Sequence, residues 1–221
     1  MKLETARFNM IEQQIRPWEV LDQTVLSLLA TVRREDFVPP AMRALAFVDT
    51  QVPLVAGEPG GPHMIEPKLE ARLLQELQVQ RHEKVLEIGT GSGYMTALLA
   101  HLAQRVISLE INPEIANMAR ANLQRAGIHN VEVRLADGSK GTPAEAPFDV
   151  ILLGGSVAEV PQPLLNLLKV GGRLVAIVGD EPIMHAQVVT RTSETNFTST
   201  DKWDDNAPRL LNFPQPSPFK F

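Results

Sequence analysis

The sequence contains no cysteine, and only 5% of its 221 residues are aromatic. Without cysteine the chain can form no disulfide, no thiolate metal site and no cysteine nucleophile. It also lacks any run of about 18 uncharged apolar residues, the length that a membrane helix needs. Met1 to Met10 mixes charged and apolar residues and has no continuous apolar core, so we expect no signal peptide. These absences predict a cytoplasmic protein without a membrane partner.

Basic residues are outnumbered, with 21 Lys and Arg against 26 Asp and Glu, which gives a formal net charge of −5. Nucleic-acid binding usually needs a clustered basic face, and the chain has no Lys/Arg run, so we expect no nucleic-acid partner. The five histidines lack the spacing of metal ligands, and we expect no metal site. These histidines are His63, His82, His101, His129 and His185.

The length and a hydrophobic content of 44% predict one globular domain with additions. We divide it into a helical N-terminal segment with a substrate loop (1–80), an α/β core (81–180), and C-terminal strands with a proline-rich tail (181–221). Helices are expected over 3–15, after the N-cap candidate Asp22, and from Pro67 onward with an apolar stripe. Three glycines and three prolines predict an irregular loop between Gly57 and Pro67.

From residue 84 apolar strands alternate with helical stretches, which predicts a mostly parallel sheet with helices on both faces. A helix over 113–126 begins with Pro113 and ends before Gly127, as the residue preferences at helix ends require. Two antiparallel strands are expected near 188–189 and 197–203. The parallel strands are expected at about 84–88, 105–109, 131–135, 148–153 and 172–178.

The first of these strands, Val85 to Ile88, runs directly into the glycine turn Gly89-Thr90-Gly91-Ser92-Gly93 and then into a helix. Glycines allow positive φ and let a ligand lie against bare main chain. The first N–H groups of the helix are free to bind such a ligand. This arrangement predicts a nucleotide-like ligand at the carboxyl ends of the strands.

The details of the turn favour S-adenosylmethionine over NAD. A dinucleotide fingerprint requires G-x-G-x-x-G, but Tyr94 stands where its last glycine would be. Glu87 would repel a pyrophosphate and attract the sulfonium and ammonium of adenosylmethionine. At later strand ends, Glu110 can accept from the ribose hydroxyls, and Asp137 can accept from the adenine amino group. The expected cofactor-binding residues are Glu87, Ile88, Gly89, Thr90, Gly91, Ser92, Gly93, Glu110, Ile111, Asp137, Gly138 and Gly154.

These residues and several further segments resemble the protein-L-isoaspartate O-methyltransferase family. The resemblance covers about residues 10 to 180. It implies a Rossmann-like, S-adenosylmethionine-dependent methyltransferase fold and a repair enzyme that methylates the isoaspartyl carboxylate of damaged proteins. The further segments are Arg33 to Pro39, Ala46 to Asp49, Asn130-Val131, Ala146 to Asp149, Glu159 to Pro161, Gly171 to Arg173 and Val178-Gly179.

The expected substrate loop departs from the family pattern Thr-Ile-Ser-Gln-Pro. Alignment on Pro67 places Ile65 at the serine position, where an aliphatic chain cannot donate a hydrogen bond, and Glu66 adds negative charge. Residues 154–156, Gly-Gly-Ser, stand where the family has Thr-Ala-Ala. An acceptor carboxylate is already ionised at neutral pH, so we expect no catalytic base. The candidates for the acceptor site are His63, Ile65, Glu66 and Ser156.

Three functions remain open from the sequence. The first is methyl transfer to isoaspartyl protein or peptide, with His63 donating in place of a hydroxyl. The second is methyl transfer to another acceptor, such as a small molecule. The third is an adenosylmethionine-binding module without catalysis. Oligomeric state is not predicted, and the tail aromatics Phe213, Phe219 and Phe221 are expected to pack locally or against a neighbour.

Overall fold

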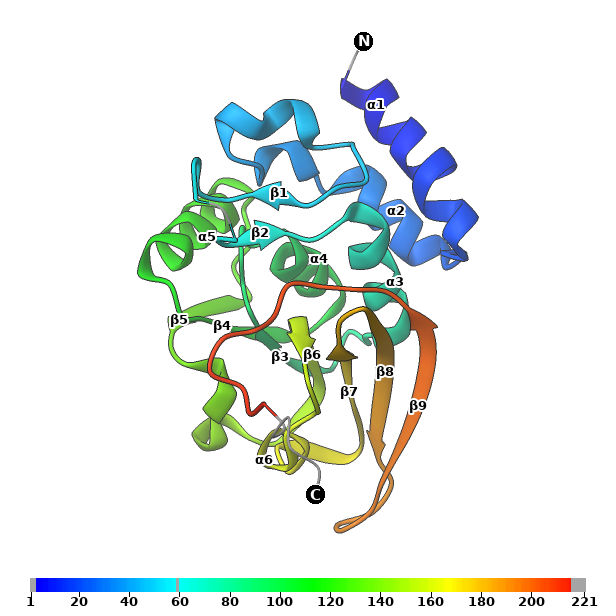
Figure 1. Ribbon diagram of the computed structural model, residues 1–221, viewed down its shortest axis with the longest axis vertical. Helices are drawn as coiled ribbons and strands as arrows, with labels where there is room; N and C mark the ends of the chain where they lie inside the picture. The colour runs from blue at the N-terminus through cyan, green and yellow to red at the C-terminus, as the bar shows by residue number, and fades with distance from the viewer. Residues whose placement is uncertain (1–2, 59, 216–221) are drawn as a thin grey trace.

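The computed structural model describes residues 3–58 and 60–215. At its centre lies a seven-stranded sheet of order β5-β4-β3-β6-β7-β8-β9 (Figure 1). The first five strands in this order are parallel, and β8 and β9 are added antiparallel at one edge. This confirms the predicted mostly parallel sheet and the two antiparallel strands. The strands are β3 (Lys84–Ile88), β4 (Arg105–Glu110), β5 (Val131–Leu135), β6 (Phe148–Val157), β7 (Leu168–Asp180), β8 (Ile183–Arg191) and β9 (Phe197–Asp204).

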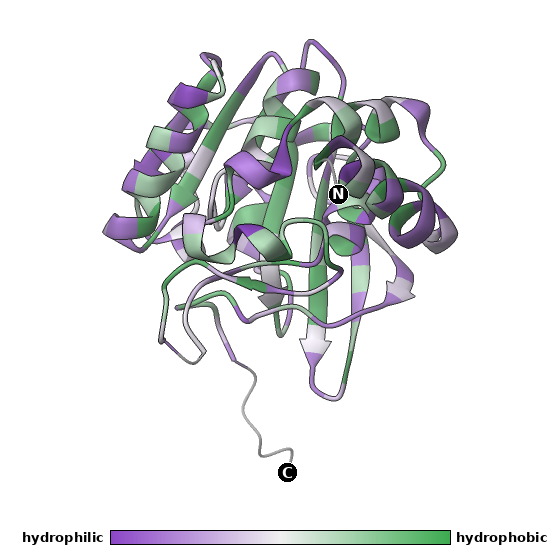
Figure 2. Cartoon of the chain, turned by 90° about the horizontal axis from the view of Figure 1, so that it is seen from above, coloured by the Kyte–Doolittle hydropathy of each residue, from purple (hydrophilic) through white to green (hydrophobic). Residues whose placement is uncertain are grey.

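Helices α3 (Pro67–Leu77), α4 (Tyr94–Leu102) and α5 (Pro113–Arg125) pack on one face of the sheet. The sheet side chains on this face share one apolar cluster with the buried stripes of the helices. In Figure 2 hydrophobic residues accordingly follow the strands, and hydrophilic residues lie on the outer sides of the helices. The predicted stripe of α3 is buried at Leu69, Leu73, Leu74 and Leu77.

The N-terminal segment lies over the same face and joins the same apolar cluster. The helix predicted over 3–15 is an α-helix, α1 (Leu3–Asn9), that continues as the π-helix η1 (Met10–Ile15). Asp22 caps α2 (Gln23–Thr31), because its Oδ1 accepts from the backbone N–H of Thr24 at 2.7 Å. Three short 3-10 turns complete the segment: η2 (Arg16–Trp18), η3 (Arg34–Asp36) and η4 (Pro40–Leu45).

The second face of the sheet has less helical cover. Its apolar cluster is closed by α6 (Gln162–Leu165) and by Phe213 near the end of the described chain. The 3-10 turns η5 (Gly138–Lys140) and η6 (Pro143–Glu145) lie beside it. Helices therefore occur on both faces as predicted. The α-helix on the second face has only four residues, whereas three longer helices cover the first face.

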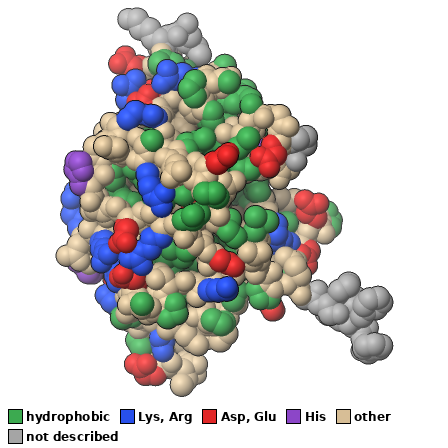
Figure 3. Space-filling view, turned by 90° about the vertical axis from the view of Figure 1, so that its left-hand side faces the viewer, with side chains coloured by type: hydrophobic (Ala, Val, Ile, Leu, Met, Phe, Trp, Pro, Cys, Tyr) green, Lys and Arg blue, Asp and Glu red, His purple; other side chains and the backbone are tan. Residues whose placement is uncertain are grey.

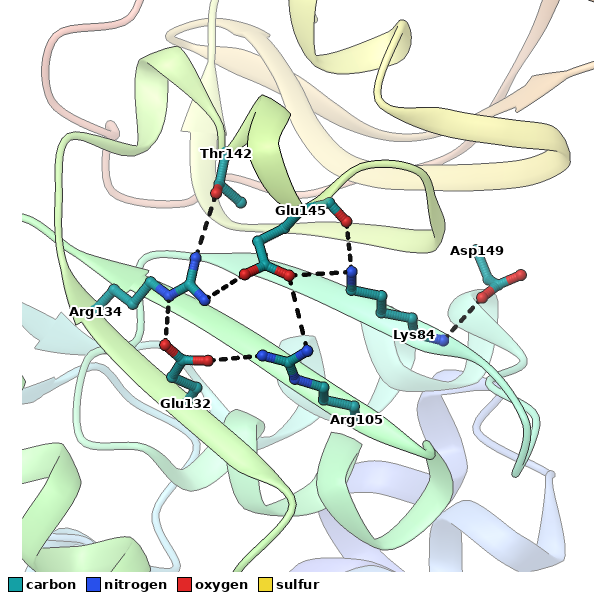
Figure 4. Close-up of polar contacts among 7 residues, drawn as sticks. All are labelled: Lys84, Arg105, Glu132, Arg134, Thr142, Glu145 and Asp149. Atoms are coloured by element: carbon teal, nitrogen blue, oxygen red, sulfur yellow. Dashed lines mark hydrogen bonds and ion pairs between the residues drawn. The ribbon is translucent and has the colours of Figure 1, made fainter.

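Ion pairs cover the β3–β4–β5 part of this second face (Figure 4). Glu132 accepts from Arg105 at 2.8 Å and from Arg134 at 2.7 Å, and Arg134 also binds Glu145 of η6 at 2.7 Å. Hydrogen bonds from Arg134 and Arg105 lower the pKa of Glu132 to about 2. The pairs are partly exposed, so each adds little to the stability of the fold. Figure 3 shows the molecule from the side of β5, with acidic and basic side chains intermixed.

Two boundaries differ from the predictions. The loop expected to be irregular from Gly57 to Pro67 contains a short strand, β2 (His63–Met64), paired antiparallel with β1 (Val52–Pro53). Met64 is buried, and its packing stabilises a strand despite the glycines and prolines around it. Strand β6 also continues past the predicted end through residues 154–156. Among the described residues no helix is long and apolar enough to cross a membrane.

Candidate functional site

The glycine turn lies between β3 and α4 at the carboxyl edge of the sheet, as predicted. Gly89, Gly91 and Gly93 have φ values of +92°, +54° and +85°, a region that L side chains adopt only with strain. A Cβ on Gly91 would meet only a Leu54 methyl at 3.7 Å, so this residue presents bare backbone to open space. A Cβ on Gly154 would lie 2.7 Å from the Gly89 carbonyl oxygen, so β6 requires glycine to approach the turn.

Glu110 holds the turn from the end of β4. Its Oε2 accepts from the backbone N–H of Gly91 at 3.0 Å, and its Oε1 accepts from that of Asn112 at 3.0 Å. Each carboxylate oxygen has a second lone pair, so Glu110 can still accept from a ligand hydroxyl. Ile111, the next residue, is 37% exposed beside it.

Glu87 lies beneath the turn and is completely buried. Its Oε2 accepts from the hydroxyls of Thr96 at 2.5 Å and Ser108 at 2.6 Å, while its Oε1 has no partner among the described residues. Burial raises the pKa of Glu87 to about 7, although both hydroxyl hydrogen bonds oppose the shift. A buried acceptor without a partner is costly, so the site suits a cationic or N–H-bearing ligand. This arrangement fits an α-ammonium group, as expected for adenosylmethionine.

Asp137 follows β5, the strand next to β4 at the edge of the sheet. Its Oδ1 accepts from the backbone N–H and the hydroxyl of Ser139, and its Oδ2 accepts from Asn212 Nδ2 at 3.1 Å. Gly138 lies against Ile88, whose Cγ2 is 2.2 Å from the place where a Cβ would be. One oxygen of the carboxylate expected to bind adenine is therefore engaged by a residue from the C-terminal region.

We call residues 207–213 the C-terminal strap, because they cross the carboxyl ends of β6 and β3 (Figure 1). Its Leu210 side chain lies 3.1 Å from the position of a Cβ on Gly89. Ser156 anchors the strap: its hydroxyl donates to the Ala207 carbonyl at 2.8 Å, and its backbone N–H donates to the Pro208 carbonyl at 2.8 Å. The candidate Ser156 is thus fully buried and holds the strap instead of lining the cavity.

A cavity of about 40 Å³ opens beside the turn and receives the substrate-loop candidates His63 and Ile65. It is too small for a whole nucleoside, so a ligand of that size would need the strap and its neighbours to move. The cavity is lined by His63, Met64, Ile65, Glu70, Leu73, Glu87, Gly89, Thr90, Gly91, Ser92, Tyr94, Met95, Leu152 and Gly154.

His63 makes a 2.5 Å contact between its Nδ1 and the Gly61 carbonyl oxygen. A carbonyl oxygen accepts only, so Nδ1 carries a proton, and in the neutral ring Nε2 is an acceptor. His63 can therefore donate to an acceptor carboxylate through Nε2 only when the ring is protonated.

The next two loop residues are buried or partly buried. Ile65 is 7% exposed, and its carbonyl accepts from Arg34 at 2.9 Å. Glu66 has a buried Oε2 without a partner among the described residues, and burial is the main cause that raises its pKa. Burial therefore opposes the negative charge that the sequence assigns to Glu66.

Sequence reasoning missed a buried group of three residues behind this loop. Arg34 pairs with Glu70 at 3.1 Å, and its guanidinium lies 5.6 Å from the centre of the Tyr94 ring. Burial raises the pKa of Glu70 to about 7, against the opposing charge of Arg34. The sequence did contain a signal for this group: Glu70 is a charged residue within the apolar stripe of α3, where a buried partner is needed.

A second, larger hollow of about 940 Å³ lies between the segment 31–43 and α5. None of the predicted site residues lines it. Its wall meets the first site through Phe37, whose ring packs edge-on against Tyr94 at 5.5 Å, and through Asn122, whose Nδ2 donates to the Ser92 carbonyl at 2.8 Å. The candidate site is therefore the glycine-turn cavity.

A doubly wound sheet with a glycine turn at its carboxyl edge and acids at the ends of β3 and β4 defines the Rossmann-like methyltransferase class. The family model for protein-L-isoaspartate(D-aspartate) O-methyltransferase matches residues 5–204. The chain belongs to this family.

The relatives agree with this assignment. A protein-L-isoaspartate O-methyltransferase of Methanoculleus marisnigri is 44% identical over 78% of this chain and 77% of its own length. One from Syntrophobacter fumaroxidans is 44% identical over 81% of this chain and 82% of its own. A Plasmodium falciparum beta-aspartate methyltransferase, solved with S-adenosyl-L-homocysteine, is 20% identical, has a TM-score of 0.74, and is matched over 95% of this chain and 98% of its own. This last likeness confirms the fold.

Proposed function

We propose that this protein uses S-adenosylmethionine to methylate the isoaspartyl carboxylate of damaged protein or peptide. The observation that carries the proposal is the glycine turn held between two acids. Beneath the turn, one Glu87 oxygen is buried and has no partner in the part of the chain that the structure describes. Membership of the family supports the same conclusion.

The residues that would hold the cofactor follow from the geometry of the turn. Glu87 would bind the ammonium end, Glu110 would accept from the ribose, and Gly91 would allow close approach of the main chain. Asp137 would accept from the adenine amino group once Asn212 has left its Oδ2. Thr90, Ser92 and Gly154 line the same cavity. The contacts expected at these three residues and at Ile88, Gly93, Ile111 and Gly138 remain predictions.

When bound, S-adenosylmethionine supplies a methyl group on a positively charged sulfur. The acceptor carboxylate has an ordinary pKa near 4 and is ionised at neutral pH, so the chain needs no general base. The loop residues around His63 and Ile65 would orient the acceptor and exclude water from the cavity. Such positioning can lower a barrier by about 7–11 kcal/mol in favourable cases.

A second candidate function is methyl transfer to a different acceptor, such as a small molecule. The observation in its favour is the chemistry of the loop: Ile65 offers no hydroxyl, and His63 in its neutral form presents an acceptor instead of a donor. Both features are less suited to a carboxylate than the hydroxyls of the family pattern.

One experiment tests the proposal and divides the alternatives. The protein is incubated with methyl-labelled S-adenosylmethionine and either an isoaspartyl peptide or the matching aspartyl peptide, and cofactor binding is measured in parallel. Transfer to the isoaspartyl peptide alone is expected. Binding without transfer to either peptide would refute isoaspartyl methylation, and a screen of small acceptors would then separate a different methyltransferase from a binding module.

We also propose that the three segments 1–80, 81–180 and 181–221 form one domain, since all three contribute to the apolar clusters of the sheet. A cytoplasmic location accords with the sequence expectations and with the proposed protein substrates.

A further inference from the structure

We propose that Arg34 is a positioning residue that fixes the acceptor loop against the cofactor turn. The inference rests on the proposed function, because it assigns the loop 61–66 to the acceptor. Arg34 lies in η3, 27 residues before the start of that loop in the sequence, and its side chain is 1% exposed.

The guanidinium of Arg34 uses its three nitrogens on three different segments. Nε donates to Glu70 Oε2 in α3 at 3.1 Å. One terminal nitrogen donates to the Ala46 carbonyl at 2.9 Å, and the other donates to the Ile65 carbonyl at 2.9 Å. The planar fork of arginine can make these divergent bonds at once, whereas a lysine ammonium is a single point on a flexible stem.

The bond to Ile65 adds a directional hydrogen bond to a part of the loop that is otherwise held by a short strand pairing and by the apolar packing of Met64 and Ile65. Strand β2 consists of only two residues, His63 and Met64, and the segment before it contains Gly57, Gly60 and Gly61. Ile65 lines the cavity immediately after β2. A buried charged hydrogen bond at this carbonyl therefore fixes the backbone from which the acceptor-facing side chains project.

Arg34 also contacts the other half of the site. Its guanidinium carbon lies 5.6 Å from the Tyr94 ring centre, within the range of a cation–π contact. Tyr94 is the first residue of α4 and follows Gly93 of the turn. One buried side chain thus spans the acceptor loop and the start of the helix that carries the cofactor turn.

A purely structural role would make Arg34 only the counterion of Glu70. The double variant Arg34→Met/Glu70→Leu distinguishes the two roles, because replacing both members of a buried ion pair by apolar residues often preserves stability. The matched control is Arg33→Met, the same substitution at the preceding position, where the side chain is 57% exposed.

The first readout is amide hydrogen exchange in the protein without added ligand. We expect exchange across 61–66 to accelerate about tenfold or more in the double variant, with the turn 89–93 changed by less than about twofold. Exchange in 61–66 equal to that of Arg33→Met would overturn the proposal and leave Arg34 as a counterion. Because no acceptor is present, this result is independent of whether the protein methylates isoaspartyl peptide.

The second readout is kinetic. For the isoaspartyl peptide we expect KM to rise about tenfold in the double variant, while the Kd for S-adenosyl-L-homocysteine changes by less than about threefold. An equal loss in Kd would also overturn the proposal, since Arg34 would then act through the turn. If the double variant does not fold, Arg34→Lys takes its place: it keeps the charge beside Glu70, and faster exchange in 61–66 is still expected. Failure of wild-type transfer would refute the proposed function alone.

Discussion

Gly91 presents its backbone to the cavity in a conformation that other residues adopt only with strain. Gly91→Val is expected to abolish cofactor binding, because the side chain would project toward the ligand from a residue at φ +54°. The measurement is calorimetric titration with S-adenosyl-L-homocysteine. Gly127→Val is the control: its φ is +70°, a Cβ there meets nothing within 4 Å, and it should lower stability without changing affinity. Wild-type affinity in Gly91→Val would mean that the ligand lies elsewhere.

The buried carboxyl of Glu87 predicts a pH-dependent affinity. Its pKa is raised to about 7, so below that pH the free protein holds it mainly protonated, and a cationic ligand must displace the proton. Affinity should therefore fall about tenfold between about pH 8 and about pH 6. Glu87→Gln should bind more weakly at about pH 8 and show a flatter profile. A Glu87→Gln profile as steep as wild type would assign the dependence to another group.

Ile65 occupies the position of the family's serine. If its missing hydroxyl limits the reaction, Ile65→Ser should raise kcat/KM on an isoaspartyl peptide by about tenfold, the value of one added hydrogen bond of about 1.4 kcal/mol. Ile65→Val is the control, because it shortens the side chain without adding a donor. No gain in Ile65→Ser over Ile65→Val would show that His63 or the backbone already supplies the donor.

At the scale of elements, the C-terminal strap competes with the cofactor for Asp137. Asn212→Ala should free Asp137 Oδ2 and tighten binding of S-adenosyl-L-homocysteine by about two- to fivefold. Leu211→Ala is the neighbouring control, since Leu211 is 64% exposed, and it should leave affinity unchanged. Weaker binding in Asn212→Ala would show that Asn212 contacts the cofactor instead of displacing it. The comparison uses the full chain at one salt concentration.

The elements that the sequence predicted well are those with a local signal. The strand before the glycine turn, the proline at the start of α5 and the Asp22 cap each depend on neighbouring residues, and the structure has all three. The strap and β2 could not be predicted in this way. The strap is held by partners far along the chain, as Leu210 is by Ser156, and β2 pairs with β1 across a loop rich in glycine and proline. Short-range periodicity carries no information about either contact.

The same limit applies to the site. Glu87 and Glu110 were identifiable because an acid at a strand end is a local pattern. The role of Arg34 depends on Ile65 and Glu70, 31 and 36 residues away, and only the fold brings them together. Ser156 is the opposite case. The sequence pattern made its hydroxyl a candidate for the acceptor site, but in the structure this hydroxyl donates to the strap.

At the scale of the whole molecule, the two tryptophans test whether the chain unfolds as one domain. Lys68 lies 4.2 Å from the Trp18 ring centre, and Arg72, one turn along α3, lies 3.9 Å from that of Trp203. Trp18 belongs to the N-terminal segment and Trp203 to β9. In Trp18→Phe and Trp203→Phe, urea unfolding followed by the remaining fluorescence should give midpoints that each match circular dichroism. Fluorescence midpoints that depart from those of circular dichroism would indicate two units.

Tyr94 is the chain's one tyrosine, and it stands at the start of α4 with its hydroxyl buried. Burial raises the pKa of its phenol above the ordinary value, so the tyrosinate absorbance band should be absent in mild alkali as long as this helix start stays closed. The appearance of that band therefore reports local opening of the cofactor turn. The protein carries an intrinsic optical probe at its candidate site, and no label has to be introduced.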